Sequence, residues 1–330
     1  MNLRVLRYFL AIVEEGSITG AAEYLSVSQP SLSRQIKELE EHLGHKLFDR
    51  GSRTITLTPA GELLRDRARE IVLMADRAEA ELTSMGKPIS GNIYIGAGET
   101  EAVRFLARAA ECMLQQYPQV KFHIFSGNSQ AVTDQLESGL LDFGLLFEPA
   151  DNTKYTYISL PTADRWGLLM RKDSTLANHD GIRQEDLEQI PLLLSRQVRF
   201  DREFSGWSSF SEHDLHVVGT YNLLFNASLF VSEGCGYALC LDRIINLTED
   251  SNLVFKPLAP ELRTRVNLVW KSNRHFSPAA SHYLEILRKQ IGAENTCKSA
   301  EARKTLECDS QYKQNNETQS ALTGLTSQRI

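Results

Sequence analysis

The stretch from Thr58 to Pro88 limits the possible folds most, because its pattern fits a single long helix. Thr58 is a suitable N-cap, Pro59 suits the first helical position, and no further proline occurs before Pro88. Apolar residues recur along it at alternating spacings of four and three, which predicts a seam for pairing with a second helix. The seam residues are Leu64, Ala68, Ile71, Ala75, Ala78, Leu82 and Met85. We therefore expect residues 59–87 to link two regions and to dimerise the chain; a helix packed on its own domain is the alternative.

Residues 1–58 have the pattern of a small, mainly α-helical domain. A stripe of apolar residues over 3–15 predicts a helix that Gly16 ends. Ser17 or Thr19 can cap a second helix, whose small apolar residues suit close packing.

The third helix combines a buried stripe with an outer face of short polar and cationic side chains. It follows the tight turn 26–28, and its buried stripe comprises Leu32, Ile36, Leu39 and Leu43. Ser28 is a suitable N-cap, and Pro30 falls in the first turn. The outer face comprises Ser28, Gln29, Pro30, Ser31, Ser33, Arg34 and Lys37. Two helices joined in this way indicate a helix-turn-helix, whose second helix reads base edges in the major groove. An ordinary surface helix is the alternative.

Residues 48–57 predict two short strands around a glycine turn, which would form a wing on the helical domain. Arg50 and Arg53 in this wing are placed to contact phosphates. Counted over residues 28–53, five Lys and Arg stand against four Asp and Glu, so the net charge is only about +1. Each domain should therefore bind DNA only modestly, and a dimer is expected.

The composition argues against several classes of protein. The chain has 330 residues, of which 42% are hydrophobic, and its formal net charge of −6 argues against binding nucleic acid through bulk charge alone. It has no apolar run long enough to span a membrane and no secretory signal, so we expect a cytoplasmic protein. Its five cysteines form no C-x-x-C pair and its histidines lack metal-ligand spacing, so no disulfide, metal or other cofactor is expected.

The residues after the breaker cluster 86–88 alternate between predicted strands and helices. The first five elements are expected at 92–95, 101–116, 120–124, 129–138 and 142–147. Their βαβαβ order indicates a parallel sheet with helices on its faces, and such sheets bind ligands at the carboxyl ends of their strands. Further strands are predicted at 166–171, 191–195, 216–220, 237–241, 254–257 and 265–270, and further helices near 184–189, 201–210, 223–233 and 278–291.

No motif in the chain supports catalysis. Gly96 and Gly98 follow a predicted strand, but Glu101 stands where a dinucleotide-binding fingerprint requires its third glycine. The chain contains no nucleophile elbow, zinc-protease motif or phosphate-binding loop. Cys235 and Cys240 are interpreted as buried small residues, with a redox sensor as the alternative. We therefore do not expect an enzyme.

The N-terminal region resembles a known family. The run LRYFLAIVEEGSITGAAEYLSVSQPSLSRQIKELEEHLGHKLFDR, followed by LTPAGELL, is similar almost position for position to the helix-turn-helix, wing and linker start of LysR-type transcriptional regulators. What the family implies covers about residues 1–290. It implies a winged helix-turn-helix domain (1–58), a linker helix (59–87) and an α/β effector-binding domain (88–292) that is similar to periplasmic binding proteins.

The resemblance divides that effector-binding domain into two subdomains. The first would comprise about residues 88–161 and 268–292, and the second about residues 162–267, with the chain crossing near 162 and returning near 267. Residues 293–330 are too poor in apolar side chains to cover a core, so they are expected to form a disordered tail. Such a tail departs from the family pattern.

The resemblance also implies a ligand site and partners. A small-molecule effector would bind between the subdomains, near the segment 98–101, where the family usually offers Ser or Thr at a helix N-terminus. The expected effector-binding residues are Glu99, Thr100, Ser126, Gly127, Asn128 and Phe147 on one side and Ser195, Arg196 and Asn222 on the other. Glu99 or Glu101 capping the following helix is the alternative. The implied partners are double-stranded promoter or operator DNA, RNA polymerase and further copies of the chain, as a homodimer or a tetramer built from dimers, but no membrane.

Two other functions stay open from the sequence. One is a constitutive DNA-binding regulator without an effector. The other is a cytoplasmic solute-binding or enzymatic domain on which residues 1–86 merely dimerise. Ligand-independent footprints would indicate the first, and a lack of sequence-specific gel retardation would indicate the second.

Overall fold

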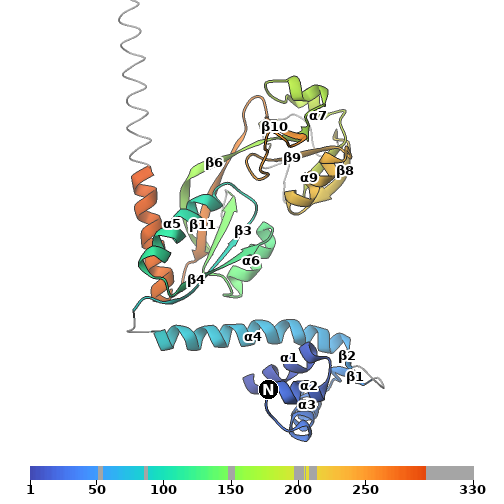
Figure 1. The fold of residues 1–330 in the computed structure, drawn as a ribbon, viewed down its shortest axis with the longest axis vertical. Coiled ribbons are helices and arrows are strands. Elements are labelled where there is room, and N and C mark those ends of the chain that lie inside the picture. The colour runs from blue at the N-terminus through green and yellow to red at the C-terminus, as the bar shows by residue number, and fades with distance from the viewer. Residues whose placement is uncertain are drawn as a thin grey trace, which may run out of the picture. The chain divides into compact units, whose positions relative to one another are not determined.

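The computed structural model forms two compact units, Met1–Gly91 with Glu137–Leu140 and Asn92–Leu136 with the chain from Leu141 onward (Figure 1). It describes residues 1–50, 55–84, 88–147, 153–196, 204, 206–207 and 214–294. The predicted tail from 295 onward, the predicted helix near 201–210 except for three residues, and Arg53 therefore lie outside the described residues. Within the described part of the chain, no helix is both long and apolar enough to cross a membrane.

The first unit contains the predicted helix-turn-helix and wing. Its elements are α1 (Leu3–Glu15), α2 (Ile18–Tyr24), α3 (Gln29–Leu43), β1 (Phe48–Arg50), β2 (Ile55–Leu57) and α4 (Pro59–Ser84). Gly16 ends α1 with φ of 64°, and the Ser17 hydroxyl caps α2 by accepting a 3.0 Å hydrogen bond from the Gly20 amide, as expected. Ser28 occupies the N-cap position of α3, but its side chain accepts no capping hydrogen bond.

A buried carboxylate connects helix α3 to the wing. Glu40 is only 5% exposed and accepts hydrogen bonds from the backbone amides of Leu47 (2.8 Å) and Phe48 (3.4 Å) and from the ammonium of Lys46 (3.2 Å). Burial raises the pKa of Glu40, but the hydrogen bonds from Leu47 and Lys46 outweigh it and hold that pKa below its ordinary value. The carboxylate therefore stays charged and fixes the direction in which the wing leaves α3.

The long helix α4 starts as predicted, with the Thr58 hydroxyl accepting a 3.1 Å hydrogen bond from the Gly61 amide. The beginning of the predicted seam, however, lies inside its own domain. Ala68 is fully buried in the core of the first unit, and Leu64 packs against that core, so the two side chains are already covered within the chain.

Most of the later part of the seam is exposed, although Ala75 is half-buried. Ile71 is 39% and Leu82 66% exposed, and Ala78 is exposed as well, while Met85 lies outside the described residues. Two further exposed apolar side chains, Leu63 and Met74, lie on the same side of the helix at 100° per residue. The surface open to a second helix is thus this stripe, which the heptad spacing identifies only in part.

The second unit is a mixed sheet with helices on its faces. The elements of its first half are β3 (Gly91–Ala97), α5 (Val103–Gln116), β4 (Val120–Ser126), α6 (Ser129–Glu137) and β5 (Phe143–Phe147). The following elements are β6 (Tyr155–Arg171), a 3₁₀ turn (Thr175–Asn178), α7 (Gln184–Leu187), β7 (Leu192–Ser195), β8 (Val217–Tyr221), α9 (Leu224–Ser232), β9 (Tyr237–Leu241), β10 (Leu253–Pro257) and β11 (Arg263–Lys271). A last helix covers residues 278–294, so the first two residues of the predicted tail are helical.

The strand order β4-β3-β5-β11-β6-β9-β7-β8, with β10 beside β6, divides the sheet into two half-sheets. We call β3, β4 and β5 the first half-sheet and β7, β8, β9 and β10 the second; β6 and β11 join them (Figure 1). β3 and β5 are parallel, as the βαβαβ pattern predicts. Within β6 only 166–171 were expected as strand, because the preceding residues lack a clear apolar alternation and include Pro161.

Where β6 pairs with the second half-sheet, both faces of the sheet are covered. Leu168 and Met170 of β6 belong to one apolar cluster, with Phe204 and Trp207, and Leu169 belongs to another, with α9. Because successive side chains of a strand point to opposite faces, this arrangement explains the nearly continuous apolar run of β6.

Candidate nucleic-acid interface and ligand site

The outer face of α3 is open to solvent, as its sequence predicts. Gln29, Pro30, Ser31, Arg34 and Lys37 are exposed and Ser33 is half-buried, whereas Leu32, Ile36 and Leu39 are buried in the domain core. Ser28 is exposed at the N-cap. The side chain of Arg50 and all of Arg53 lie outside the described residues, so the predicted phosphate contacts of the wing stay predictions.

The cations on this face are paired within the helix, but only weakly. Arg34 Nε lies 2.9 Å from Glu38 Oε1, and Lys37 Nζ lies 3.6 Å from Glu41 Oε1. The side chains of Arg34 and Glu38 are 80% and 50% exposed, and solvent-exposed pairs of this kind contribute on the order of 0.3–0.5 kcal/mol. Either cation can therefore exchange its partner for a nucleic acid at little cost.

Tyr24 is an exposed side chain next to the turn before α3, and the sequence did not suggest it as a site residue. It ends α2, immediately before the turn to α3, and is 69% exposed. The signal was an aromatic residue at the end of a short helix, directly before the turn.

The loop after β3 forms a buried contact with β6. The Thr100 hydroxyl donates a hydrogen bond to the carboxylate of Asp164 and accepts one from the Ala102 amide (3.1 Å). Thr100 is 8% and Asp164 5% exposed. The hydroxyl expected to face a ligand is thus bonded to a protein carboxylate that the sequence analysis did not single out, because its partner is 64 residues away.

Asp164 lies in an unfavourable place for a negative charge. Burial is the largest effect that raises its pKa, to about 6, and repulsion from Glu101 and Asp242 adds to it. The hydrogen bond from Thr100 and the charge of Arg243 act in the opposite direction. Near neutral pH this carboxyl group is consequently much closer to protonation than an ordinary aspartate.

Glu99 connects the first half-sheet to a helix of the second. Its Oε2 accepts a hydrogen bond from the backbone amide of Leu224, the first residue of α9. The N-cap residue of α9, Leu223, has no side chain that can accept such a bond, so Glu99 satisfies a free amide at the positive end of that helix. Glu99 therefore does not cap its own helix, α5; Glu101 is the residue that pairs there, with Arg104 at 2.7 Å.

The remaining predicted ligand residues fall into two groups. Gly127 donates to the Ala97 carbonyl (3.0 Å), and Asn128 caps α6 by accepting from the Ala131 amide (2.8 Å), while Ser126 is exposed at the end of β4. Arg196 is exposed, and its Nε donates to the Thr220 hydroxyl (3.2 Å). Ser195 ends β7, and Asn222 follows β8.

The two groups come from different half-sheets. Glu99, beside the first half-sheet, accepts a hydrogen bond from the amide of Leu224, beside the second. This predicted ligand residue therefore connects the two sides. Phe147, at the end of β5, packs against the core of the second half-sheet.

One of the two cysteines interpreted as buried differs from its expected environment. Cys240 is buried, as predicted, and burial raises the pKa of its thiol, which disfavours the reactive thiolate. Cys235 is exposed, so its interpretation as a buried small residue is wrong; its place in the turn after α9 leaves the side chain uncovered. No group of His, Cys, Asp and Glu among the described residues is arranged to hold a metal ion.

Comparisons with known proteins agree along most of the chain. The family profile described as "LysR substrate binding domain" matches residues 86–292, and the profile "Bacterial regulatory helix-turn-helix protein, lysR family" matches residues 3–62. The uncharacterized HTH-type transcriptional regulator YfeR of Shigella flexneri is 27% identical over 297 residues, which cover 88% of this chain and 95% of YfeR.

Solved structures share the fold. HinK, a LysR family transcriptional regulator from Pseudomonas aeruginosa, is 27% identical, with a TM-score of 0.51 and coverage of 88% of this chain and 98% of HinK. Full-length CbnR complexed with its target DNA gives a TM-score of 0.66 at 19% identity, covering 88% of this chain and 99% of CbnR.

The raised pKa of Asp164 predicts a pH-dependent stability. Between pH 3.8, its ordinary pKa, and about pH 6, the folded protein holds a proton that the unfolded chain releases. The free energy of unfolding therefore falls as the pH rises through this range, and the stability that the proton contributes at low pH is lost above a pH of about 6. Asp164→Asn keeps an acceptor for Thr100 without the charge. It should raise the free energy of unfolding by up to about 3 kcal/mol at a pH of about 8, but by only about half as much at about 5.

Thermal and urea unfolding at both pH values checks this prediction. Asp250→Asn is the control, since Asp250 is exposed. An equal effect of Asp164→Asn at both pH values would contradict a buried, titrating carboxyl group.

Proposed function

The chain belongs to the LysR family of bacterial transcriptional regulators, and we propose that a small molecule bound between the two half-sheets controls how it binds DNA. It is a DNA-binding regulator with a substrate-binding domain and not an enzyme. The observation that carries the proposal is the bond from Glu99, beside the first half-sheet, to the N-terminus of α9, beside the second. A ligand that breaks or strengthens this bond would change the orientation of the two half-sheets relative to each other.

The proposed control needs a difference in affinity between two arrangements. A ligand shifts an equilibrium only as far as it binds one arrangement better than the other. Glu99 supplies such a difference, because its carboxylate either stays on the amide of Leu224 or becomes available to the ligand. Ligand binding on one side and DNA binding on the other would then be coupled through the linker helix α4.

We assign the reading of base edges to the outer face of α3, with Gln29, Ser31, Ser33 and Arg34 nearest the bases. Lys37 and the wing residues Arg50 and Arg53 are proposed to contact phosphates. A net charge of −6 for the whole chain means that this binding depends on where the cations lie and on a second copy of the domain.

The proposed assembly is a homodimer through the exposed stripe of α4, or a tetramer built from two such dimers. On promoter DNA this assembly would act on RNA polymerase, and its place of action is the cytoplasm.

A constitutive regulator is the second candidate, and one observation favours it. The hydroxyl of Thr100 and the carboxylate of Glu99, both predicted to face an effector, are bonded to Asp164 and Leu224 instead. A protein whose own groups occupy these positions can hold its half-sheets together without a ligand. Footprints that do not change with any effector would support this candidate.

The division of labour on α3 and the wing can be tested by two substitutions. Arg34→Ala should cost about 1–3 kcal/mol at the preferred DNA site and relax the preference at one base pair, because a base-edge contact is lost. Arg53→Ala should weaken binding to all sequences alike. Gel retardation on the operator and on random DNA measures both effects. Equal losses on both DNAs for both variants would show that the division is wrong.

The assembly can be tested on α4. Ile71→Asp places a charge in the exposed apolar stripe, where its desolvation should separate the two helices. Leu73→Asp is the matched control, because Leu73 is similarly exposed (44% against 39%) but lies about 200° around the helix from Ile71. Sedimentation should show smaller particles for Ile71→Asp alone. An unchanged oligomer for Ile71→Asp would exclude this stripe as the interface.

The effector class can be tested through Glu99. An anionic group can use the N-terminus of α9 only by displacing this carboxylate, whereas an amine can pair with it. Small polar or amine-bearing metabolites should therefore raise the melting temperature of the full chain more than simple carboxylates do. Glu99→Gln keeps the acceptor for Leu224, removes the charge and should narrow the difference.

Glu111→Gln, on the exposed side of α5, is the control and should leave the difference intact. A screen in which simple carboxylates stabilise most, with no change in Glu99→Gln, would refute this role of Glu99. The assignment of the chain as a regulator would still stand.

A further inference from the structure

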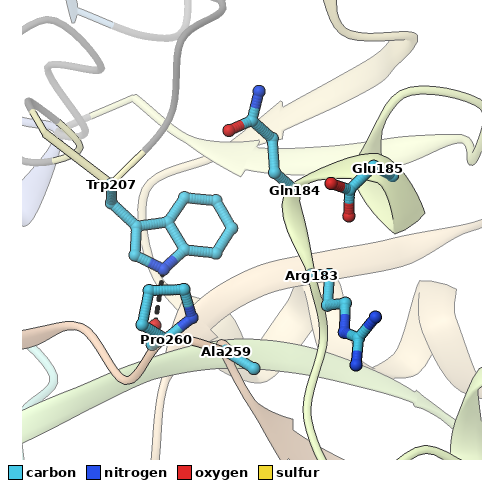
Figure 2. A pocket seen from close by; sticks show the side chains of 6 residues that line it. All are labelled: Arg183, Gln184, Glu185, Trp207, Ala259 and Pro260. Atoms are coloured by element: carbon cyan, nitrogen blue, oxygen red, sulfur yellow. Dashed lines mark hydrogen bonds between the residues drawn. The ribbon is translucent and has the colours of Figure 1, made fainter.

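The second half-sheet carries a pocket that none of the predicted effector residues lines. It lies between the start of α7 and the turn from β10 to β11, and its volume is about 440 Å³ (Figure 2). This volume is within the range of about 300–1,000 Å³ that is common for small-molecule sites. The lining residues are Arg183, Gln184, Glu185, Trp207, Ala259 and Pro260.

The walls of this pocket are fixed to each other by hydrogen bonds. The Ile182 amide donates to the Pro257 carbonyl (2.8 Å), and the Ala259 amide donates to the Ile182 carbonyl (2.7 Å). Trp207 is 9% exposed, and its indole N–H donates to the Pro260 carbonyl at 2.6 Å. This side of the pocket is consequently preformed, so a ligand would have to order only the exposed side chains on the other side.

One side of the pocket is apolar and the other is charged. Figure 2 shows the indole of Trp207 beside the ring of Pro260, with Arg183, Gln184 and Glu185 across from them. The N–H of Trp207 is already bonded, so the indole offers only its apolar surface. The side chains of Arg183 and Glu185 are exposed, and neither forms an ion pair with another side chain that the structure describes.

We propose that this pocket binds a small zwitterion with a flat or branched apolar body, of the α-amino-acid type. The apolar body would lie against Trp207 and Pro260, its carboxylate would pair with Arg183, and its ammonium would pair with Glu185. A plain carboxylate would pair with Arg183 but face the like charge of Glu185. A plain amine would pair with Glu185 but face the like charge of Arg183. A ligand with both charges satisfies both side chains, because guanidinium and carboxylate groups prefer opposite partners.

This site is separate from the proposed effector site at Glu99. None of its lining residues contacts Glu99, Thr100 or Asp164 through a hydrogen bond that we find among the described residues. The turn that carries Ala259 and Pro260 leads directly into β11, the strand that returns to the first half-sheet. Ligands at the two sites would therefore act on the same pair of joining strands from different places.

Three matched probes test the proposal on the full chain: phenylalanine, 3-phenylpropionate without the ammonium, and phenethylamine without the carboxylate. Calorimetric titration and quenching of tryptophan emission should both detect phenylalanine. We expect the other two probes to bind at least about tenfold more weakly, because each lacks one charge and so leaves Arg183 or Glu185 without an opposite partner. Tenfold corresponds to about 1.4 kcal/mol. Trp207→Phe should remove the change in emission while calorimetry still reports binding.

Single substitutions then identify the contact of each charge. Arg183→Gln should bring phenylalanine down to the affinity of phenethylamine, and Glu185→Gln should bring it down to that of 3-phenylpropionate. Glu188→Gln is the control, since Glu188 is exposed in the same segment but does not line the pocket.

Three results would overturn the proposal: no binding of phenylalanine, equal binding of all three probes, or binding that Arg183→Gln and Glu185→Gln leave unchanged. Binding that responds to Glu99→Gln but not to these two variants would place the ligand at the effector site instead. The pocket would then be only a surface hollow.

Discussion

The pairing of β6 with β11 is the interaction on which the substrate-binding domain depends. The two long strands run antiparallel, from Tyr155 opposite Lys271 to Arg165 opposite Arg263. β11 also pairs with β5 of the first half-sheet, and β6 pairs with β9 of the second. The register shifts between Arg265 and Asn267, so the regular ladder is interrupted where the chain passes from one half-sheet to the other. Both half-sheets are therefore held by two connected strands, and bending at this passage would change their orientation relative to each other without breaking either core.

Polar contacts at the passage use groups of the protein itself. Asp164 lies on β6 within it and accepts from Thr100, and Glu99 reaches the amide of Leu224 on α9. Buried charge is unfavourable unless it is paired or hydrogen-bonded, and the raised pKa of Asp164 shows that the compensation is incomplete. A ligand that replaced one of these bonds would have to outweigh its net contribution, which is about 1.5–3 kcal/mol for a hydrogen bond to a charged group. Such contacts suit a switch better than a fully satisfied core would.

The DNA-binding unit carries little net positive charge, so the positions of its few cations have to be fixed. Glu40 is the residue that fixes it, because its buried carboxylate joins the end of α3 to the backbone of Leu47 and Phe48. The cations that face outward, such as Arg34, are held by weak exposed pairs that a nucleic acid can replace. A chain with a net charge of −6 can bind DNA in this way, since local placement and a second copy of the domain compensate for the missing bulk charge.

The sequence by itself determined the parts of the protein that depend on local patterns. Apolar periodicity, caps and glycine stops predicted α1, α3, α4 and most strands, because those signals act within one turn or one strand. The sequence could not show that Ala68 is buried, that Glu40 holds the wing, or that Glu99 caps a helix 125 residues away. It also could not place Trp207 beside Pro260. Only the tertiary structure decided these contacts, because a side chain's partner across the fold depends on how distant segments pack, and a period of two or 3.6 residues carries no information about that.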